Sequence, residues 1–122
     1  SLVALRAGRV MNAMLMREVF ARLGNWRLLE ASTGAEGLKL ARAEQPELLL
    51  TDMNLPDMNG LTLLQQMRAE PQLEGLLCVA LSAEDHGDQV AAARRAGFSD
   101  YWIKPIDVPR LIEALRATLH RA

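Results

Sequence analysis

The chain has 122 residues, about half of them hydrophobic, and a net charge of −1. This length suits one domain with a proper hydrophobic core, and no apolar run approaches the roughly 20 residues of a membrane span. The balanced charge argues against a nucleic-acid-binding surface, and no segment resembles a signal peptide, so the expected location is the cytoplasm.

Short apolar runs alternate along the chain with segments of helical periodicity. The apolar runs predict strands, and the periodic segments predict helices. The expected strands are 2–5, 26–31, 48–52, 76–81 and 100–103. The expected helices are 10–23, 33–43, 61–69, 89–96 and a last one that follows Asp107. This alternation predicts βαβ units, a parallel sheet and an α/β fold, in one domain over residues 1–122 without an internal linker or repeat.

Helix ends and apolar faces support these assignments. The pattern from Thr33 to Glu36 is a capping box, and Asp107 is expected to cap the last helix. Cys78 lies within an apolar run and is expected to be a buried, reduced thiol. The first helix should bury Met11, Leu15, Val19 and Leu23, with Met14 and Phe20 beside them. The last helix should bury Val108, Leu111, Ile112, Leu115 and Leu119.

The segment from Glu47 to Gly60 contains the first candidate for chemistry. Three leucines lead into Thr51 and Asp52, and the sequence then becomes polar and rich in turn residues. Such a run is typical of a strand buried on both faces of a parallel sheet. Asp52 then lies at the carboxyl end of a central strand, where open α/β sheets bind ligands. It either caps the following loop or serves as a nucleophile or metal ligand.

Two other strands also end in polar residues. The fourth expected strand is followed by Ser82 and the fifth by Lys104, so both should face Asp52 across one edge of the sheet. Taken singly, Ser82 reads as a helix cap and Lys104 as a solvated side chain. A carboxylate, a hydroxyl and an ammonium at successive strand ends together indicate a functional site.

Three segments resemble the response-regulator receiver domains of two-component signalling, and the likeness covers essentially the whole chain. They are Leu-Leu-Leu-Thr-Asp-Met-Asn-Leu-Pro-Asp-Met-Asn-Gly at 48–60, Val-Ala-Leu-Ser-Ala at 79–83, and Ala-Gly-Phe-Ser-Asp-Tyr-Trp-Ile-Lys-Pro-Ile-Asp at 96–107. The resemblance implies a flavodoxin-like sheet with strand order 2-1-3-4-5. The last segment is similar to receivers attached to hybrid sensor histidine kinases. Because the sequence shows no output domain and Ser1 is not a natural start, we expect the chain to come from a longer protein.

The resemblance also assigns roles to single residues. It implies that Asp52 is the phosphoacceptor, that Ser82 bonds the phosphoryl group, and that Lys104 is the paired cation. Tyr101 matches the aromatic switch residue that moves between outward and inward positions, and Pro105 matches a cis peptide bond.

The metal site departs from the family pattern. Receivers usually carry an acidic pair after the first strand, which holds Mg²⁺ together with the phosphoacceptor, but the matching residues here are Ala7 and Gly8. Asp52 and the backbone carbonyl of Asn54 are the remaining ligands. Because Mg²⁺ is normally bound through one or two carboxylates in octahedral geometry, we expect weak binding or none.

Arginines surround the same region. The first 29 residues hold five arginines and one acid, and Arg6 and Arg9 flank the altered positions. Two arrangements are open: one of the two arginines approaches Asp52 and replaces the metal's charge, or both arginines point into water. Two unit charges near 4 Å interact by roughly 4 kcal/mol at an effective dielectric of 20, enough to compete with a metal ion.

Three functions remain open from the sequence. The first is a phosphorelay receiver that accepts phosphate on Asp52 from a histidine kinase or phosphotransfer domain, with slow or absent Mg²⁺ chemistry, and signals to an output domain or partner protein. The second is a degenerate pseudo-receiver that binds a partner regardless of phosphorylation. The third is a phosphohydrolase of the haloacid-dehalogenase kind, which needs an acid where Asn54 stands. We expect no enzyme activity beyond phosphorylation and dephosphorylation of Asp52 itself.

Overall fold

The computed structural model describes residues 2–9, 13–83 and 87–121, in which strands and helices alternate as predicted. The strands are β1 (Leu2–Ala7), β2 (Trp26–Ala31), β3 (Leu48–Asp52), β4 (Leu77–Ser82) and β5 (Asp100–Ile103). The helices are α1 (Ala13–Leu23), α2 (Gly34–Glu44), α3 (Gly60–Arg68), α4 (Gly87–Ala96) and α5 (Val108–Arg121), with a 3₁₀ turn, η1, at Pro71–Leu73. The predicted start of the first helix, at residues 10–12, lies outside the described residues.

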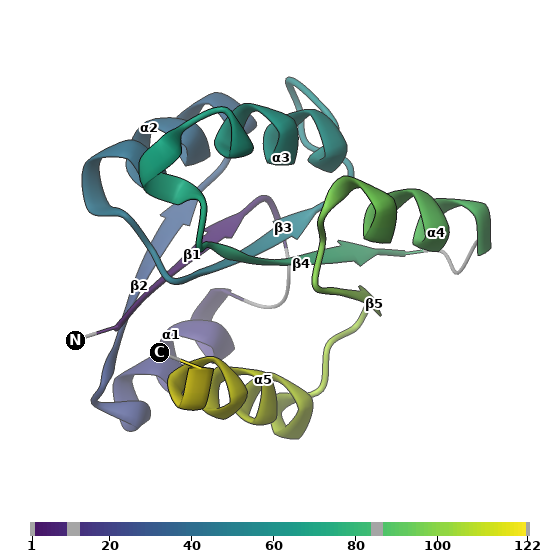
Figure 1. The fold of residues 1–122 in the computed structure, drawn as a ribbon. Helices are drawn as coiled ribbons and strands as arrows, with labels where there is room; N and C mark the ends of the chain where they lie inside the picture. The colour runs from purple at the N-terminus through teal and green to yellow at the C-terminus, as the bar shows by residue number, and fades with distance from the viewer. Residues whose placement is uncertain (1, 10–12, 84–86, 122) are drawn as a thin grey trace.

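The strands form one parallel sheet in the order β2-β1-β3-β4-β5, which confirms the order that the resemblance implied. Helices α2, α3 and α4 cover one face, and α1 and α5 cover the other (Figure 1). No helix in the described part of the chain is both long and apolar enough to cross a bilayer.

Strand β3 is the centre of the core, and all five of its residues are buried. Leu49 packs toward α2, α3 and α4, whereas Leu48 and Leu50 pack toward α1 and α5. Alternate side chains of a strand point to opposite faces, so a continuous leucine run fits a strand with helices on both sides. Cys78, on β4, is buried as predicted, and burial raises its pKa to about 12.

Strand β1 runs two residues further than predicted. Arg6 and Ala7 continue the strand because β2 and β3 pair with them on both sides. This extension carries the chain to Gly8 directly beside the end of β3, since an added methyl group on Gly8 would lie 2.8 Å from the Cβ of Asp52.

The predicted apolar face of α1 was partly wrong. Met14 is 78% exposed and Leu15 is 40% exposed. Residues four apart advance by 400° around a helix, which is more than a full turn. A strict four-residue repeat therefore drifts off one face, whereas alternating spacings of three and four residues stay on it. The side chains of α1 that are buried against the sheet are Met16, Val19 and Phe20.

Both predicted caps are present. The hydroxyl of Thr33 accepts a hydrogen bond from the Glu36 backbone N–H at 3.1 Å, and the Asp107 carboxylate accepts one from the Arg110 N–H at 2.7 Å. In α5, Leu111 and Leu115 are fully buried as predicted, and Val108 and Ile112 are half-buried. Two other predicted face positions, Met11 and Leu119, have side chains outside the described part.

Candidate functional site

An open cleft of about 1070 Å³ lies at the carboxyl edge of the sheet. It is bounded by the end of β1, the β2–α2 link, the β3–α3 loop and the segment after β5. This is the edge at which the sequence placed the candidate residues. The polar side chains that line the cleft are Arg6, Arg9, Ser32, Asp52, Asn54 and Lys104.

Asp52 and Lys104 form an ion pair at the centre of this edge. The Nζ of Lys104 donates to Oδ2 of Asp52 at 2.6 Å, with side-chain exposures of 25% and 11%. The other carboxylate oxygen, Oδ1, accepts the backbone N–H of Asn54 at 3.0 Å. Two strand ends that are 52 residues apart in sequence therefore meet at one carboxylate.

Ser82 closes β4, between those two strand ends. Its side chain is buried, and its carbonyl accepts the backbone N–H of Lys104 at 2.8 Å. The neighbouring residue, Leu81, is the sheet partner of Asp52. The peptide bond between Lys104 and Pro105 is cis. The expected convergence of Asp52, Ser82 and Lys104 on one edge is thus present in the fold.

Tyr101 is buried under α4 rather than exposed. Its ring belongs to the core that packs against α2, α3 and α4. Its hydroxyl donates a hydrogen bond to Oε1 of Gln89, on α4, at 3.2 Å. Tyr101 therefore lies in an inward position and contacts the helix that follows Ser82.

The end of β1 presents no carboxylate to the cleft. Ala7 is buried, and it faces α2, where a methyl group added to Gly37 would lie 3.6 Å from its Cβ. Gly8 has a φ of +78°, and an added Cβ there would lie 2.8 Å from the Cβ of Asp52 and 2.7 Å from Leu55. Neither position can carry an acidic side chain into the cleft without moving its neighbours.

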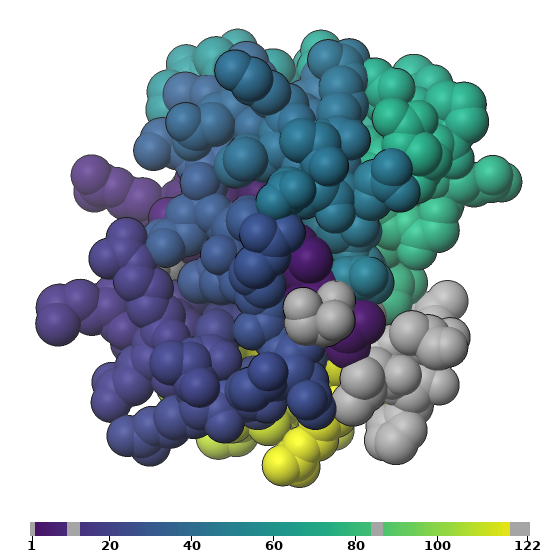
Figure 2. Space-filling view, turned by 90° about the vertical axis from the view of Figure 1, so that its left-hand side faces the viewer, coloured from purple at the N-terminus to yellow at the C-terminus, as the bar shows by residue number. Residues whose placement is uncertain are grey.

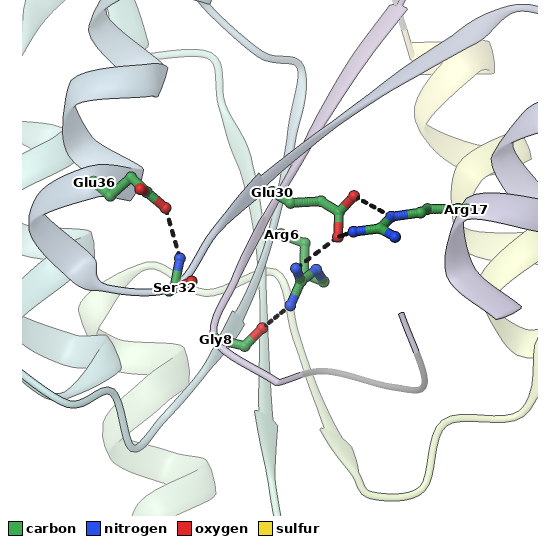
Figure 3. A network of polar contacts seen from close by, with 6 residues as sticks. All are labelled: Arg6, Gly8, Arg17, Glu30, Ser32 and Glu36. Atoms are coloured by element: carbon green, nitrogen blue, oxygen red, sulfur yellow. Dashed lines mark hydrogen bonds and ion pairs between the residues drawn. The ribbon is translucent and has the colours of Figure 1, made fainter. Parts of the chain in front are cut away.

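The position of the Arg6 side chain matches neither of the two arrangements that the sequence left open. It donates to Glu30 at 2.7 Å and to the carbonyl of Gly8, so it neither binds Asp52 nor points into water (Figure 3). Glu30 also accepts from Arg17 of α1 at 2.7 Å. The hydrogen bond from Arg17 lowers the pKa of Glu30 most; Arg6 acts in the same direction, and burial opposes both.

Arg9 behaves differently from Arg6. Its side chain is exposed where it lines the cleft, and it makes no hydrogen bond or ion pair with the residues that the structure describes. Of the two arginines beside the altered positions, one is therefore fixed in a network and the other is available to a ligand.

Two residues of this region were missed by the sequence reasoning. Glu30 is the direct register partner of Arg6 on β2, and a charged pair inside two neighbouring strands was the available signal. Asp57 accepts the backbone N–H groups of Gly34 at 2.8 Å and Ala35 at 3.0 Å, which ties the loop after Asp52 to α2. These two backbone hydrogen bonds lower the pKa of Asp57.

The donor set does not fit Mg²⁺. Within residues 2–9, 13–83 and 87–121, no three His, Cys, Asp or Glu side chains are grouped so that they could hold a metal ion. Both oxygens of Asp52 already accept hydrogen bonds, one of them from a cation. A hard divalent cation needs several oxygen ligands, and the described part of the cleft lining offers one carboxylate against three cationic side chains.

In Figure 2, which views the molecule from the β2 side, residues of β2 and α2 lie in front of β1. This cover is consistent with the low exposure of the Arg6 side chain, 13%. Arg6 belongs both to the cleft lining and to the network with Glu30 and Arg17, whereas the exposed side chain of Arg9 lines the cleft outside that network.

Comparisons with known proteins agree with this architecture. The family model described as the response regulator receiver domain matches residues 9–116. A chemotaxis protein CheY homolog of Campylobacter jejuni is 34% identical over 106 residues, which are 86% of this chain and 82% of that protein. The polar-differentiation response regulator DivK of Brucella ovis is 30% identical over 109 residues, covering 89% of this chain and 88% of that protein.

A solved structure shows the same fold at lower identity. The crystal structure of a two-component response regulator from Clostridium difficile superimposes with a TM-score of 0.84 at 19% identity, over 99% of this chain and 98% of that one. The family match covers most of the residues, the curated relatives cover most of both chains, and the strand order agrees. The chain therefore belongs to the response regulator receiver domain family of two-component signalling.

Proposed function

We propose that this receiver accepts a phosphoryl group on Asp52 from the phosphohistidine of a kinase or phosphotransfer domain, and that it does so without a tightly bound divalent cation. The 2.6 Å pair between Asp52 and Lys104, at the edge where three strands end, is the observation that carries this proposal. The pair is accessible from an open cleft, which leaves room for a donor to approach.

In the proposed reaction a carboxylate oxygen of Asp52 attacks the phosphorus of the donor. The new O–P bond forms as the P–N bond to the donor histidine breaks, and the imidazole nitrogen leaves with the electron pair. Lys104 holds the carboxylate by one oxygen and the Asn54 N–H holds it by the other, so the nucleophile is oriented before the donor arrives.

The product is an aspartyl phosphate with about two negative charges in place of one. Lys104 is within reach of these oxygens because it already contacts the carboxylate that carries them. Ser82, at the neighbouring strand end, is the proposed hydroxyl partner. No proposed step passes through a metal ion, because the residues that the structure describes around the cleft do not supply the carboxylates to hold one.

The proposed output is a change in the surface of α4, β5 and α5, which an output domain or partner protein reads. Tyr101 of β5 is hydrogen bonded to Gln89 of α4, and Ser82 ends the strand that leads to α4. A charge placed at Asp52 and bonded by Ser82 would alter this contact, which is a local charge event that biases a packed surface.

One observation favours a second function, a pseudo-receiver that binds its partner in a single state. Tyr101 is buried, and its hydroxyl donates a hydrogen bond to Gln89 of α4. If this inward position is fixed, phosphorylation changes the surface little. The two functions differ in whether Asp52 is modified at all.

Intact-mass measurement after incubation with a small-molecule phosphodonor separates them. We expect a slow phosphoryl adduct on the wild type, equal in yield with Mg²⁺ and with a chelator, and no adduct on Asp52→Asn. A strict requirement for Mg²⁺ would contradict the metal-independent part of the proposal. No adduct, even with a phosphorylated histidine phosphotransfer domain as donor, would leave the pseudo-receiver as the function.

A further inference from the structure

The charges around the cleft do not balance. Among the described residues, Arg6, Arg9 and Lys104 line it together with a single carboxylate, that of Asp52. Lys104 is neutralised by Asp52 in a direct pair. The excess positive charge of the lining therefore comes from Arg6 and Arg9, and its size depends on the charged residues that pair with them.

Glu30 compensates only part of that excess. It is a single carboxylate bonded to two guanidinium groups, those of Arg6 and Arg17, so this network keeps one positive charge (Figure 3). The Nε of Arg6 is buried and has no hydrogen-bond partner among the described residues. Arg9 is unpaired among the described residues, so the described part of this region carries about two uncompensated positive charges.

We propose that this cleft is an oxyanion site, which binds a phosphoryl dianion without a divalent cation and in which Arg9 is the principal binding residue. The ligand is either free inorganic phosphate or the phosphoryl group on Asp52; the covalent form rests on the function proposed above, and the free form does not. Arg9 here provides positive charge on the side of Asp52 opposite Lys104.

Position 9 suits this role because of what precedes it. Gly8 lies against Asp52 so closely that its added Cβ would be 2.8 Å from the Cβ of Asp52. The next residue, Arg9, therefore leaves the sheet directly beside the phosphoacceptor, and its side chain lines the same cleft as Lys104. A guanidinium can bond two oxygens of one phosphoryl group through its fork of N–H donors.

Arg6 cannot take this role in the same way. Its terminal nitrogens are bound to Glu30 and to the carbonyl of Gly8, and its side chain is only 13% exposed. It acts instead as a fixed charge in the wall of the cleft. The field of such fixed charges attracts an anion and opposes the entry of a divalent cation.

Titration with inorganic phosphate tests the free form directly. Amide resonances of Gly8 and Asn54, in two-dimensional NMR with a chelator present and ionic strength held constant, report on occupancy of the cleft. We expect saturable shifts in the wild type and in Asp52→Asn, unchanged by Mg²⁺. Arg9→Ala should weaken the affinity on the order of tenfold, since it removes a charge-assisted hydrogen-bond donor.

Arg22→Ala is the matched control. It removes the same charge from an arginine that is 79% exposed on α1 and paired with Glu18, away from the cleft lining. Its phosphate affinity should equal that of the wild type, and Arg9→Lys should keep part of the affinity. Equal loss in Arg9→Ala and Arg22→Ala, or shifts that require Mg²⁺ or never saturate, would overturn the proposal.

The covalent form has its own readout. The lifetime of the Asp52 adduct should be shorter in Arg9→Ala than in Arg22→Ala, because the acyl phosphate loses a bound cation. An unchanged lifetime would overturn Arg9 as its partner. If the wild type forms no adduct while Asp52→Asn still binds phosphate through Arg9, the proposed function fails and the oxyanion site stands. If the wild type forms an adduct but phosphate binding does not depend on Arg9, the oxyanion site fails and the proposed function stands.

Discussion

The carboxyl edge of the sheet has two parts that differ in kind. At the ends of β3, β4 and β5, Asp52, Ser82 and Lys104 are present, and the first and last of them are bonded at 2.6 Å. At the end of β1, Ala7 faces the core and Gly8 lies against Asp52. One part keeps the residues for which we propose a role in phosphoryl transfer, and the other presents no carboxylate among the described residues.

The β1 end differs from the other part in its backbone and its charges as well as in its residue types. The backbone of Gly8 occupies the space beside Asp52, and the neighbouring charge is organised by Glu30 on β2 and Arg17 on α1. Under the proposal made above, this cleft favours an anion over a divalent cation.

The largest effect is expected from Gly8→Asp, which places an acid at the β1 end. We expect it to lower the free energy of unfolding by about 2–4 kcal/mol, because a positive φ and contact with Asp52 and Leu55 both oppose a side chain. Urea denaturation measures this. Gly24→Asp is the control, since Gly24 has a φ of +66° with nothing within 4 Å of an added Cβ. A Gly8→Asp variant as stable as Gly24→Asp would mean that the β1 end is open after all.

The second effect comes from Glu30→Gln, which removes the charge shared by Arg6 and Arg17. We expect a loss of about 2–3 kcal/mol at neutral pH, because a largely buried guanidinium is left without its partner. Glu18→Gln breaks an exposed pair with Arg22 and should cost less than about 0.5 kcal/mol. Similar midpoints for the two variants in urea would show that the network is not structural.

A smaller effect is expected at the retained part of the site. Lys104→Met should destabilise the wild type more than it destabilises Asp52→Asn, with a coupling energy of about 1–2 kcal/mol, because the partly buried carboxylate loses its cation only in the first case. A double-mutant cycle in urea measures the coupling. A value near zero would mean that the 2.6 Å pair contributes nothing to the fold.

The smallest effect is the pH dependence that Glu30 contributes. The pKa of Glu30 is lowered in the folded chain from its ordinary value of 4.5, so the unfolded chain binds the proton more readily. The stabilisation is therefore complete above pH 4.5 and is lost as the pH falls through the lower, folded pKa. The difference in unfolding free energy between wild type and Glu30→Gln should shrink over that range; a constant difference would contradict the assignment.

The sequence predicted the fold and the strand-end residues well, for a physical reason. Alternating apolar runs and helical periods determine where each strand ends, and parallel strands bring their carboxyl ends to one edge. The sequence alone therefore predicted that Asp52 and Lys104 lie close together.

The partners of Arg6 could not be predicted in that way. They depend on the register of β1 against β2, which sets Arg6 opposite Glu30, and on the approach of Arg17 from α1. The burial of Met16 in place of Leu15 depends likewise on the rotation of α1 against the sheet. The close approach of Gly8 to Asp52 depends on the backbone conformation of Gly8, and a glycine can adopt several backbone conformations.

A Mg²⁺ titration of the wild-type chain, followed by the amide resonances of Gly8 and Asn54, tests directly the claim that the cleft does not bind a divalent cation. Because the described lining carries excess positive charge and one carboxylate, we expect no saturable shift, even with the metal in large excess over the protein. A saturable shift at both amides, lost in Asp52→Asn, would contradict the claim and show that this receiver binds its metal through other ligands.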